Sequence, residues 1–298
     1  MPAKQPLISI ISVNYNEPEE TLAFLGSVYQ SDYPSFETIL VDNGSKRKID
    51  RSLEQQYPNL TCIIHEENLG FAGGNNLGIK AAKGKYLVFL NNDTLIPTDF
   101  LTKMVAFMVD HPEAGIASPK VIYPNGMVQY AGAKKIHPLT GRGKRIGLME
   151  TDRGQFNCTH PTDLPHGAAM IIPKKIIEQV GHMPEEYFLY YEEHDWCMKI
   201  QHAGYKMFYF GDTHVVHKES ISVGVNSPLQ VYYMNRNRLL FQRRNTKGLP
   251  RVCGILFYGI FAFPKQLIQY VSKGMFHHAE NLVRGTLWHL NKNYDYKG

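Results

Sequence analysis

Apolar runs alternate with polar turns and amphipathic stretches along the first part of the chain. Continuously apolar, β-branched segments lie at 7–13, 38–41, 61–64 and 86–90. Such runs are typical of strands that are buried on both faces of a parallel sheet. The stretches between them carry helical spacing, and this repeated strand–helix alternation predicts a doubly wound α/β sheet.

Helix boundaries are indicated by polar residues and glycines that flank the apolar periods. Asn16 with Glu19 three residues later resembles a capping box, so we predict that the first helix begins there. Two further helices are predicted around 176–180 and 195–202, because each is followed by a glycine that can close a helix.

Two segments depart from this alternation. Residues 131–160 carry glycines among Lys and Arg with little hydrophobic period, which indicates a mobile loop. Residues 252–263 are apolar and aromatic, but a run of about a dozen residues is shorter than the roughly 20 that a spanning helix needs. We therefore expect this helix either to lie in a membrane interface or to pack on the domain. The predicted boundaries are 5–245 for the α/β domain and 246–298 for a helical tail.

Composition places the chain among compact globular proteins. Apolar residues make up 43% and charged residues 20% of the 298 residues, which argues against disordered or integral membrane classes. The four cysteines form no C-x-x-C pair, so neither a zinc knuckle nor a disulfide framework is indicated. The N-terminus shows no apolar signal-peptide core. We expect a protein of the reducing cytosol.

The net charge of +5 is modest, but basic residues crowd into 134–145 and 236–251. Such clusters can face phosphates of a nucleotide, a lipid headgroup or nucleic acid. They are equally compatible with a solvated helix face.

Polar clusters directly follow three of the predicted strands. They are Asn14-Tyr15-Asn16-Glu17, Asp42-Asn43-Gly44-Ser45 and Asn91-Asn92-Asp93. In an open parallel sheet, ligands bind outside the carboxyl ends of the strands, so these clusters should converge on one site. The phosphate-binding signatures G-x-G-x-x-G after the first strand and G-x-x-x-x-G-K-[ST] do not occur. The glycine-rich segment 70–78 suits close approach to ribose or diphosphate, or is a plain loop.

The ordered series of motifs is similar to that of family 2 glycosyltransferases, specifically their rhamnosyltransferase-like branch. The resemblance covers most of residues 7–245 and implies a GT-A fold, a Rossmann-like, mostly parallel sheet flanked by helices, here with a C-terminal helical tail. The motifs that carry it are Ile11–Asn16, Val41–Ser45, Asn68–Asn76, Leu90–Thr94, His166–Met170, Tyr187–Lys199, His214–Ser220 and Tyr232–Arg244.

The resemblance implies a nucleotide pocket at the carboxyl edge of the sheet. Asp42 is expected to contact the base, and Arg236 is expected near the diphosphate or an anionic acceptor. The full set of expected nucleotide-binding residues is Asn14, Tyr15, Asn16, Glu17, Asp42, Asn43, Gly70, Asn75, Asn76, Asn92 and Arg236.

A metal site is also implied. Asp93 matches the aspartate of a DXD-like motif, although Asn91 and Asn92 stand where relatives often offer a second acid. His217 matches a histidine that the family places near the metal. A cation stabilises the diphosphate leaving group as a Lewis acid, and hard oxygen ligands suit Mg²⁺ or Mn²⁺. Alternatively, the histidines of H-x-x-H are structural.

The acidic motif of residues 190–197 resembles the one that supplies the catalytic base. Glu193 occupies the position of the base, and Glu192 and Asp195 are further candidates. A carboxylate that takes the proton of an attacking hydroxyl acts as a general base, and a single essential carboxylate fits direct inversion. The alternative is that these acids simply stabilise a helix N-terminus.

We therefore expect an inverting glycosyltransferase that uses a nucleotide-sugar donor such as dTDP-L-rhamnose. The acceptor would be a surface glycan linked to a polyprenyl carrier, and the enzyme would act in the cytoplasm at the inner face of the cell membrane. No nucleic-acid partner is expected. Two alternatives are a sugar-1-phosphate nucleotidylyltransferase, whose basic glycine-rich signature is absent, and a silent carbohydrate-binding scaffold, which would lack the acids.

Overall fold

The computed structural model describes residues 5–218 and 227–291. Four parallel strands form one half of its central sheet, in the order β3-β2-β1-β4. They are β1 (Ile8–Asn14), β2 (Phe36–Asn43), β3 (Leu60–His65) and β4 (Tyr86–Leu90). These strands confirm the four predicted from apolar runs. The strand order reverses between β1 and β4, which is where ligands bind in such sheets.

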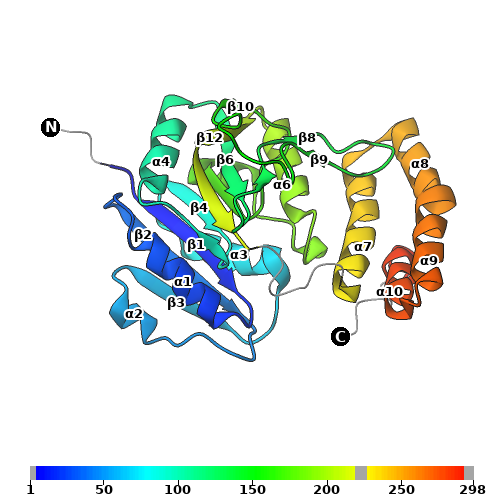
Figure 1. Cartoon of the computed structure of the whole chain (residues 1–298), viewed down its shortest axis with the longest axis horizontal. Helices are drawn as coiled ribbons and strands as arrows, with labels where there is room; N and C mark the ends of the chain where they lie inside the picture. The colour runs from blue at the N-terminus through cyan, green and yellow to red at the C-terminus, as the bar shows by residue number, and fades with distance from the viewer. Residues whose placement is uncertain (1–4, 219–226, 292–298) are drawn as a thin grey trace.

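The other half of the sheet is mixed (Figure 1). β11 (Ala169–Pro173) runs antiparallel between β4 and β6 (Ala114–Ile122), and β12 (Lys206–His217) runs parallel to β6. Three short strands add to its edges: β5 (Thr94–Leu95), β7 (Val128–Tyr130) and β10 (Thr159–Pro161). As a result, β4, β6 and β12 run in the same direction, and their carboxyl ends lie at the same edge of the sheet.

Helices cover the sheet on both faces. They are α1 (Pro18–Val28), α2 (Leu53–Gln56), α3 (Gly70–Ala81), α4 (Phe100–Asp110), α5 (Lys174–Val180), the 3-10 turn Glu185–Tyr187 and α6 (Glu192–His202). α5 and α6 confirm the helices predicted around 176–180 and 195–202. The predicted capping box at Asn16 is wrong: α1 has no side-chain cap, because Asn16 Oδ1 instead accepts hydrogen bonds from the backbone of Lys46 and Arg47.

The glycines of α3 allow this helix to lie directly on β1. A Cβ at Gly74 would stand 2.9 Å from Val13 Cγ1, and one at Gly78 would overlap Ile11. Real Cβ atoms do not approach this closely, so both positions require glycine. These two glycines serve helix–sheet packing, and the segment is a helix and not a plain loop; its approach to ribose or diphosphate stays a prediction.

The C-terminal helices form a group on one side of the sheet (Figure 1). α7 (Pro228–Asn245) lies next to the domain and contacts α8 (Gly248–Phe257) and α10 (Phe276–Leu287). The Tyr258 hydroxyl lies 2.8 Å from Thr286 Oγ1, and Trp288 is buried against the guanidinium of Arg236. The division at residue 245 stays a prediction, since α7 packs with the tail as well as with the domain.

α8 continues through a π-helical turn (Tyr258–Ala262) into α9 (Phe263–Ser272). The resulting helix Gly248–Ser272 has 25 residues and a mean hydropathy of 1.3 over its most apolar stretch, so by length and composition it is sufficient to cross a membrane. The expectation of an apolar run too short to span is therefore wrong about length. Residues outside 252–263 extend the helix, which the apolar run alone did not indicate.

The segment 131–160 is largely irregular and contains the small hairpin β8 (Ala133–Lys134) and β9 (Lys144–Arg145). We call residues 133–145 the basic arm. It reaches across to the C-terminal helices (Figure 1), where the Gln242 side chain donates a hydrogen bond to Pro138 O. The Tyr191 hydroxyl donates another to Gly141 O. The arm thus connects the domain to the tail.

Candidate active site

A buried polar network closes the carboxyl ends of β1, β2 and β4. Asn14 is fully buried; its Nδ2 donates to Asp42 Oδ2 at 2.9 Å, and its Oδ1 accepts from Thr21 Oγ1 at 3.0 Å. Asn92 joins the network through Thr21 Oγ1 at 3.0 Å. These asparagines tie the three strand ends together, and that function leaves their amides facing the interior.

Asp42, which was expected to contact the nucleotide base, is hydrogen-bonded within the protein. It is fully buried, and its oxygens accept hydrogen bonds from the backbone of Ser45 and Ile49 as well as from Asn14. A carboxylate that is hydrogen-bonded in this way shapes the loop after β2. The base contact expected of Asp42 stays a prediction.

Partly exposed groups on the same edge remain available for a nucleotide. Tyr15, Asn16 and Glu17 lie between β1 and α1 and are partly exposed. The loop after β2 adds the exposed side chains of Lys46 and Arg47 beside Asn16. We keep these residues as the candidate nucleotide pocket, at the point where the strand order reverses.

Four expected nucleotide-binding residues instead organise the start of α3. Asn43 donates to Gly70 O at 2.9 Å and accepts from Leu69 N at 3.0 Å. The Asn76 amide pairs with both the backbone N–H and the carbonyl of Met183, and Asn75 donates to Phe71 O. Asn43, Gly70, Asn75 and Asn76 thus make hydrogen bonds within the fold, and their contact with a nucleotide stays a prediction.

Arg236, which was expected near the diphosphate or an anionic acceptor, makes its observed contacts within the fold, and a ligand contact stays a prediction. It is 5% exposed, and its guanidinium donates to the carbonyls of Glu186 and Tyr187 at 2.6 and 2.7 Å. The neighbouring Asn237 donates to the carbonyls of Tyr187, Leu189 and Tyr190. The Arg236-Asn237 motif therefore holds the loop that precedes α6.

That loop is conformationally unusual. Phe188, Tyr190 and Tyr191 all have positive φ, at 64°, 68° and 75°. Side chains other than glycine adopt this region at a cost, so it persists where surrounding bonds over-determine it. The bonds from Arg236 and Asn237 do so here, and they set the point at which the acids of α6 enter the site.

Asp93 and His217 meet at the ends of β4 and β12. Their Oδ1 and Nε2 atoms lie 3.2 Å apart, and both side chains are largely buried. Asp93 Oδ1 is buried without a hydrogen-bond partner. Among the described residues no third His, Cys, Asp or Glu completes a cluster. Two protein ligands with remaining positions left to phosphate oxygens and water suit Mg²⁺ or Mn²⁺.

Gln129, a residue that the sequence analysis missed, fixes the tautomer of His217. Its Oε1 lies 2.7 Å from His217 Nδ1, and both residues are buried. With the amide oxygen as acceptor, Nδ1 carries the proton, and the lone pair of Nε2 lies on the side of Asn91 Nδ2, at 3.3 Å, and Asp93 Oδ1, at 3.2 Å. Such a partner orients a metal-binding histidine. The available signal was a glutamine within the apolar strand β7, flanked by Val128 and Tyr130.

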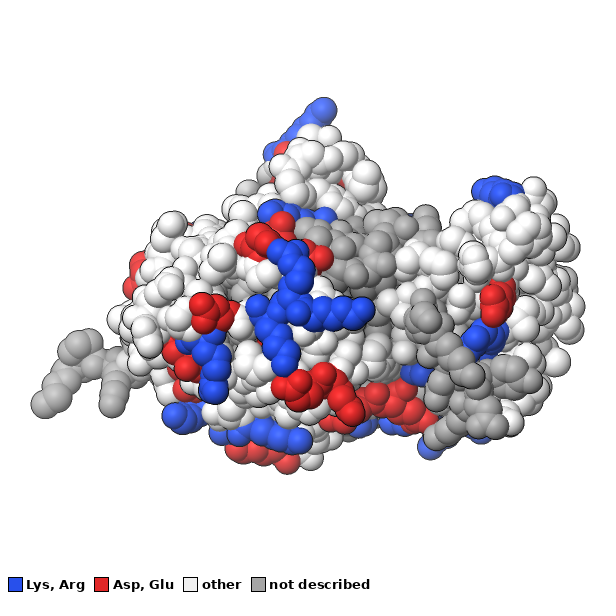
Figure 2. Space-filling view, turned by 90° about the horizontal axis from the view of Figure 1, so that it is seen from below, with Lys and Arg blue, Asp and Glu red and all other residues white. Residues whose placement is uncertain are grey.

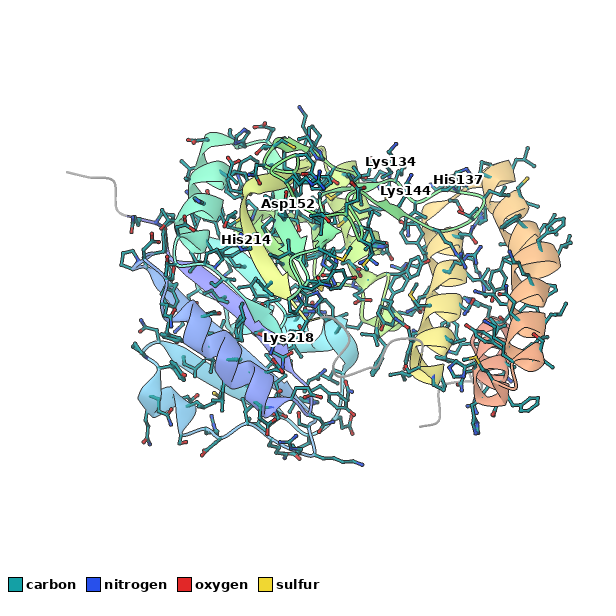
Figure 3. All side chains as sticks on the ribbon, viewed as in Figure 1. Lys134, His137, Lys144, Asp152, His214 and Lys218 are labelled. Atoms are coloured by element: carbon teal, nitrogen blue, oxygen red, sulfur yellow. The ribbon has the colours of Figure 1, made fainter. Side chains whose placement is uncertain are left out.

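Lys218 is a second missed residue, directly after His217. Its Nζ lies 2.5 Å from Glu20 Oε2, and its backbone N–H donates to Asp93 O at 3.2 Å. Figure 3 shows it at the end of β12. Figure 2 shows Lys and Arg side chains gathered in the middle of the molecule's lower face, interleaved with acids. A cation at this strand end suits an anionic leaving group. The last two residues of the motif His214–Ser220 lie outside the described residues.

The His166-Gly167 turn connects this pair to the acids of α6. The ring of His166 lies 5.8 Å from that of His217. A Cβ added at Gly167 would stand 3.7 Å from Glu193 Oε1, so the absent side chain leaves room beside the carboxylate. Burial lowers the pKa of His166 well below its usual value, which keeps the ring neutral. Glu193 thus faces the same edge of the sheet as Asp93 and His217.

The three acids of α6 have different surroundings. Glu192 is 3% exposed, and burial, with a contribution from the charge of Glu193, raises the pKa of Glu192 well above its usual value. Asp195 is buried and pairs with Arg244 Nε of α7 at 2.7 Å. Glu193 is partly exposed, and its Oε1 lies 3.5 Å from His194 Nδ1. Glu193 is therefore the acid that remains available to a substrate.

Comparison with known proteins decides the family. The model of glycosyl transferase family 2 matches residues 9–181. The chain belongs to glycosyl transferase family 2. It is a glycosyltransferase of the GT-A fold that uses a nucleotide-sugar donor, as the sequence predicted, and the nucleotidylyltransferase alternative is set aside.

Two curated relatives and one solved structure illustrate the range of this family. The chain is 25% identical to the low-salt glycan biosynthesis hexosyltransferase Agl10 of Haloferax volcanii, over 78% of this chain and 74% of the relative. It is 23% identical to the N-acetylglucosaminyl-diphospho-decaprenol L-rhamnosyltransferase of Mycobacterium tuberculosis, over 73% and 78%. The mannosyltransferase PcManGT of Pyrobaculum calidifontis, solved with GDP-Man and Mn²⁺, has 19% identity and a TM-score of 0.59, over 98% and 83%.

Proposed function

We propose that this glycosyltransferase moves a hexose, with L-rhamnose from dTDP-rhamnose as the leading candidate, onto a hydroxyl of a glycan that is carried on a polyprenyl diphosphate. The transfer inverts the anomeric centre. The observation that carries the proposal is the convergence of the Asp93–His217 pair and the Glu193 carboxylate on one edge of the sheet. The rhamnosyltransferase relative, which acts on a diphospho-decaprenol acceptor, supports the choice of sugar and carrier.

The metal would be held by Asp93 and His217. Bound there, Mg²⁺ or Mn²⁺ supplies Lewis-acid stabilisation of the departing diphosphate. Gln129 orients the ring of His217, and the adjacent Lys218 is held in an ion pair with Glu20. A cation held by Asp93 and His217 would place positive charge where negative charge develops, which is the usual source of electrostatic catalysis.

Glu193 is proposed as the general base. It takes the proton from the acceptor hydroxyl as that oxygen attacks the anomeric carbon, a role worth about 10²–10⁴ in rate. Burial raises the pKa of Glu192 well above its usual value, which disfavours Glu192 as a charged base. Asp195 is occupied by Arg244, so no second free carboxylate of this helix stands ready as a nucleophile, and one-step inversion follows.

The nucleotide is proposed to lie against Tyr15, Asn16 and Glu17, at the edge between β1 and β4. The loop after β2 supplies Lys46 and Arg47 on the same side. Asn14, Asp42 and Asn92 hold the strand ends on which the pocket rests.

We further propose that the enzyme works at the cytoplasmic face of the cell membrane, with α8 and α9 lying in an anionic lipid surface. Residues that pack inward include Gly254 and Tyr258. On the outward face, an apolar stripe is between 48% and 74% exposed. Its members are Leu249, Val252, Leu256, Ile260, Ile268 and Val271.

Charge supports an anionic lipid as the occupant of this face. Between Glu219 and Glu280 the sequence contains no Asp or Glu, whereas Arg251, Lys265 and Lys273 flank or interrupt the stripe. The group of C-terminal helices shows few charges on the face drawn in Figure 2. Basic residues beside an apolar helix face are typical of interfacial helices. Since the inward face contacts α7 and α10, we place the helix along the surface and not across it.

A donor screen tests the proposed function. The full chain would be incubated with Mn²⁺ and each of a set of nucleotide sugars, and its thermal unfolding and release of nucleoside diphosphate would be measured. We expect dTDP-rhamnose to raise the melting temperature most, because a ligand of the native state stabilises it. A larger shift with another donor, together with transfer of that sugar, would overturn the proposed sugar.

A further inference from the structure

Arg238 of α7 is a buried cation without an acidic partner. It is 3% exposed, and its Nε and Nη1 atoms have no hydrogen-bond partner. The guanidinium lies 5.0 Å from the ring centre of Tyr258, and no carboxylate of residues 5–218 or 227–291 forms an ion pair with it. A buried, unpaired charge is costly, so this position needs a reason.

The basic arm brings a second arginine to the same place. Gly141 has φ 61°, and a Cβ there would stand 2.9 Å from Arg238 Cγ, so the arm's backbone lies directly on Arg238. Arg142 follows Gly141 and is exposed. Desolvation lowers the pKa of Arg238, and the like charge of Arg142 lowers it further. Two cations that repel each other with no acid between them are the arrangement of an anion site.

The surroundings add charge of the same sign. Residues 131–149 contain no Asp or Glu and several Lys and Arg. Figure 3 shows Lys134 and Lys144 close together at the base of the arm and His137 farther along it, toward α8. Positive charge is therefore distributed along the whole arm, from the sheet to the C-terminal helices.

We propose that Arg142 and Arg238 form a phosphate-binding site that holds the diphosphate of the lipid-linked acceptor. A diphosphate brings two or more negative charges to guanidinium groups, which bind phosphate through paired N–H donors. This site depends on the proposed function, because it would bind the diphosphate end of the same lipid-linked acceptor whose sugar hydroxyl receives the hexose.

The position of this site fits an acceptor that spans from sugar to lipid. The hydroxyl of Tyr191 contacts the arm at Gly141 O, and Tyr191 stands only two residues before Glu193 in the sequence. On the other side, Arg142 contributes to the electrostatic surroundings of Tyr270 on α9. A diphosphate at Arg142 thus lies between the proposed base and the helices whose outward face is apolar.

The direct test is binding of inorganic pyrophosphate to the full chain in EDTA, at constant ionic strength. Without metal or donor, we expect pyrophosphate to raise the melting temperature in a saturable way. Arg142→Gln should abolish this shift. In pyrophosphate-free buffer the same variant should be at least as stable as the wild type, because a like charge beside Arg238 has been removed.

Matched variants separate this site from others. Lys134→Gln removes one charge from the same arm and should keep the shift, and Asp93→Ala should keep it because the metal pair is not involved. Absence of a saturable shift in the wild type, or an equal shift in Arg142→Gln, would overturn the site. Neither outcome depends on donor or transfer, so the proposed function could stand while this site fails.

A second experiment distinguishes the carrier diphosphate from a phospholipid headgroup. With a synthetic short-chain prenyl diphosphate glycan, Arg142→Gln should raise the acceptor KM about tenfold, the effect of one charge-assisted contact. Donor KM should not change. Binding to vesicles that contain phosphatidylglycerol should also be unaffected. Weakened vesicle binding with an unchanged acceptor KM would assign Arg142 to the headgroup and overturn the proposal.

Discussion

His217 Nδ1 lies 2.7 Å from Gln129 Oε1, and this contact turns the opposite ring nitrogen toward Asp93. Replacing Gln129 by Ala should raise the Mn²⁺ concentration for half-maximal activity by about 10–100-fold, the usual effect of losing such a partner. Mn²⁺ binding followed by electron paramagnetic resonance should weaken in parallel. Gln129→Glu keeps an acceptor for Nδ1–H and should retain more affinity. Equal metal titrations for wild type and Gln129→Ala would refute this role.

Asn237 stabilises the loop that carries three left-handed residues into α6. Asn237→Ala removes hydrogen bonds to the carbonyls of Tyr187, Leu189 and Tyr190. We expect the free energy of unfolding to fall by about 1–3 kcal/mol, since buried carbonyls lose their donor. kcat should fall as well, because Glu193 follows this loop. Urea denaturation measures the first effect, and Asn245→Ala on the same helix, whose amide contacts Phe241 O within that helix, is the control.

His289 makes the packing of the tail dependent on pH. Its Nε2 lies 2.8 Å from Arg236 O, and Nδ1 faces Arg243. Burial lowers the pKa of His289 to about 4, below its value of about 6.5 in an unfolded chain. A depressed histidine pKa contributes stability that is complete above pH 6.5 and is lost as the pH falls toward 4. Unfolding free energies measured between pH 7.5 and 4.5 should therefore decline less in His289→Gln than in the wild type.

The apolar stripe should mediate lipid binding. Leu256→Asn together with Ile260→Asn replaces two exposed apolar side chains and should reduce co-sedimentation with vesicles that contain phosphatidylglycerol, by about tenfold or more. Val109→Asn on α4, which is also exposed, is the matched control. Melting temperatures should stay within a few degrees, because these residues do not pack inward. Unchanged co-sedimentation of the double variant would show that the apolar stripe does not bind lipid.

The parallel half of the sheet could be predicted because β1 to β4 contain continuous apolar runs, and the central strands β1 and β4 are buried on both faces. The same strands also predicted that Asn14, Asp42 and Asp93 lie at one edge of the sheet. The roles of individual polar residues could not be predicted. Asp42 and Asp93 both follow buried strands, yet one is saturated by backbone donors of its own loop and the other is not.

The internal contacts of the polar residues depend on partners that are distant in the sequence. Arg236 is positioned by carbonyls of the loop before α6, and Gln129 by a histidine on another strand. Neither partner is adjacent in the sequence, so the residue type alone could not distinguish a ligand contact from an internal one. The family resemblance supplied Asp93, His217 and Glu193. It could not indicate that Asp195 pairs with Arg244.

The central claim is that Glu193 is the base and Asp195 holds α6 to α7. The most direct measurement compares Glu193→Gln and Asp195→Asn in single-turnover sugar transfer, with donor affinity measured separately. We expect Glu193→Gln to lower the transfer rate by about 10²–10⁴ with donor affinity unchanged. Asp195→Asn should chiefly lower the unfolding free energy, by about 1.5–3 kcal/mol. Near-normal transfer by Glu193→Gln, with loss of transfer in a stably folded Asp195→Asn, would contradict the assignment.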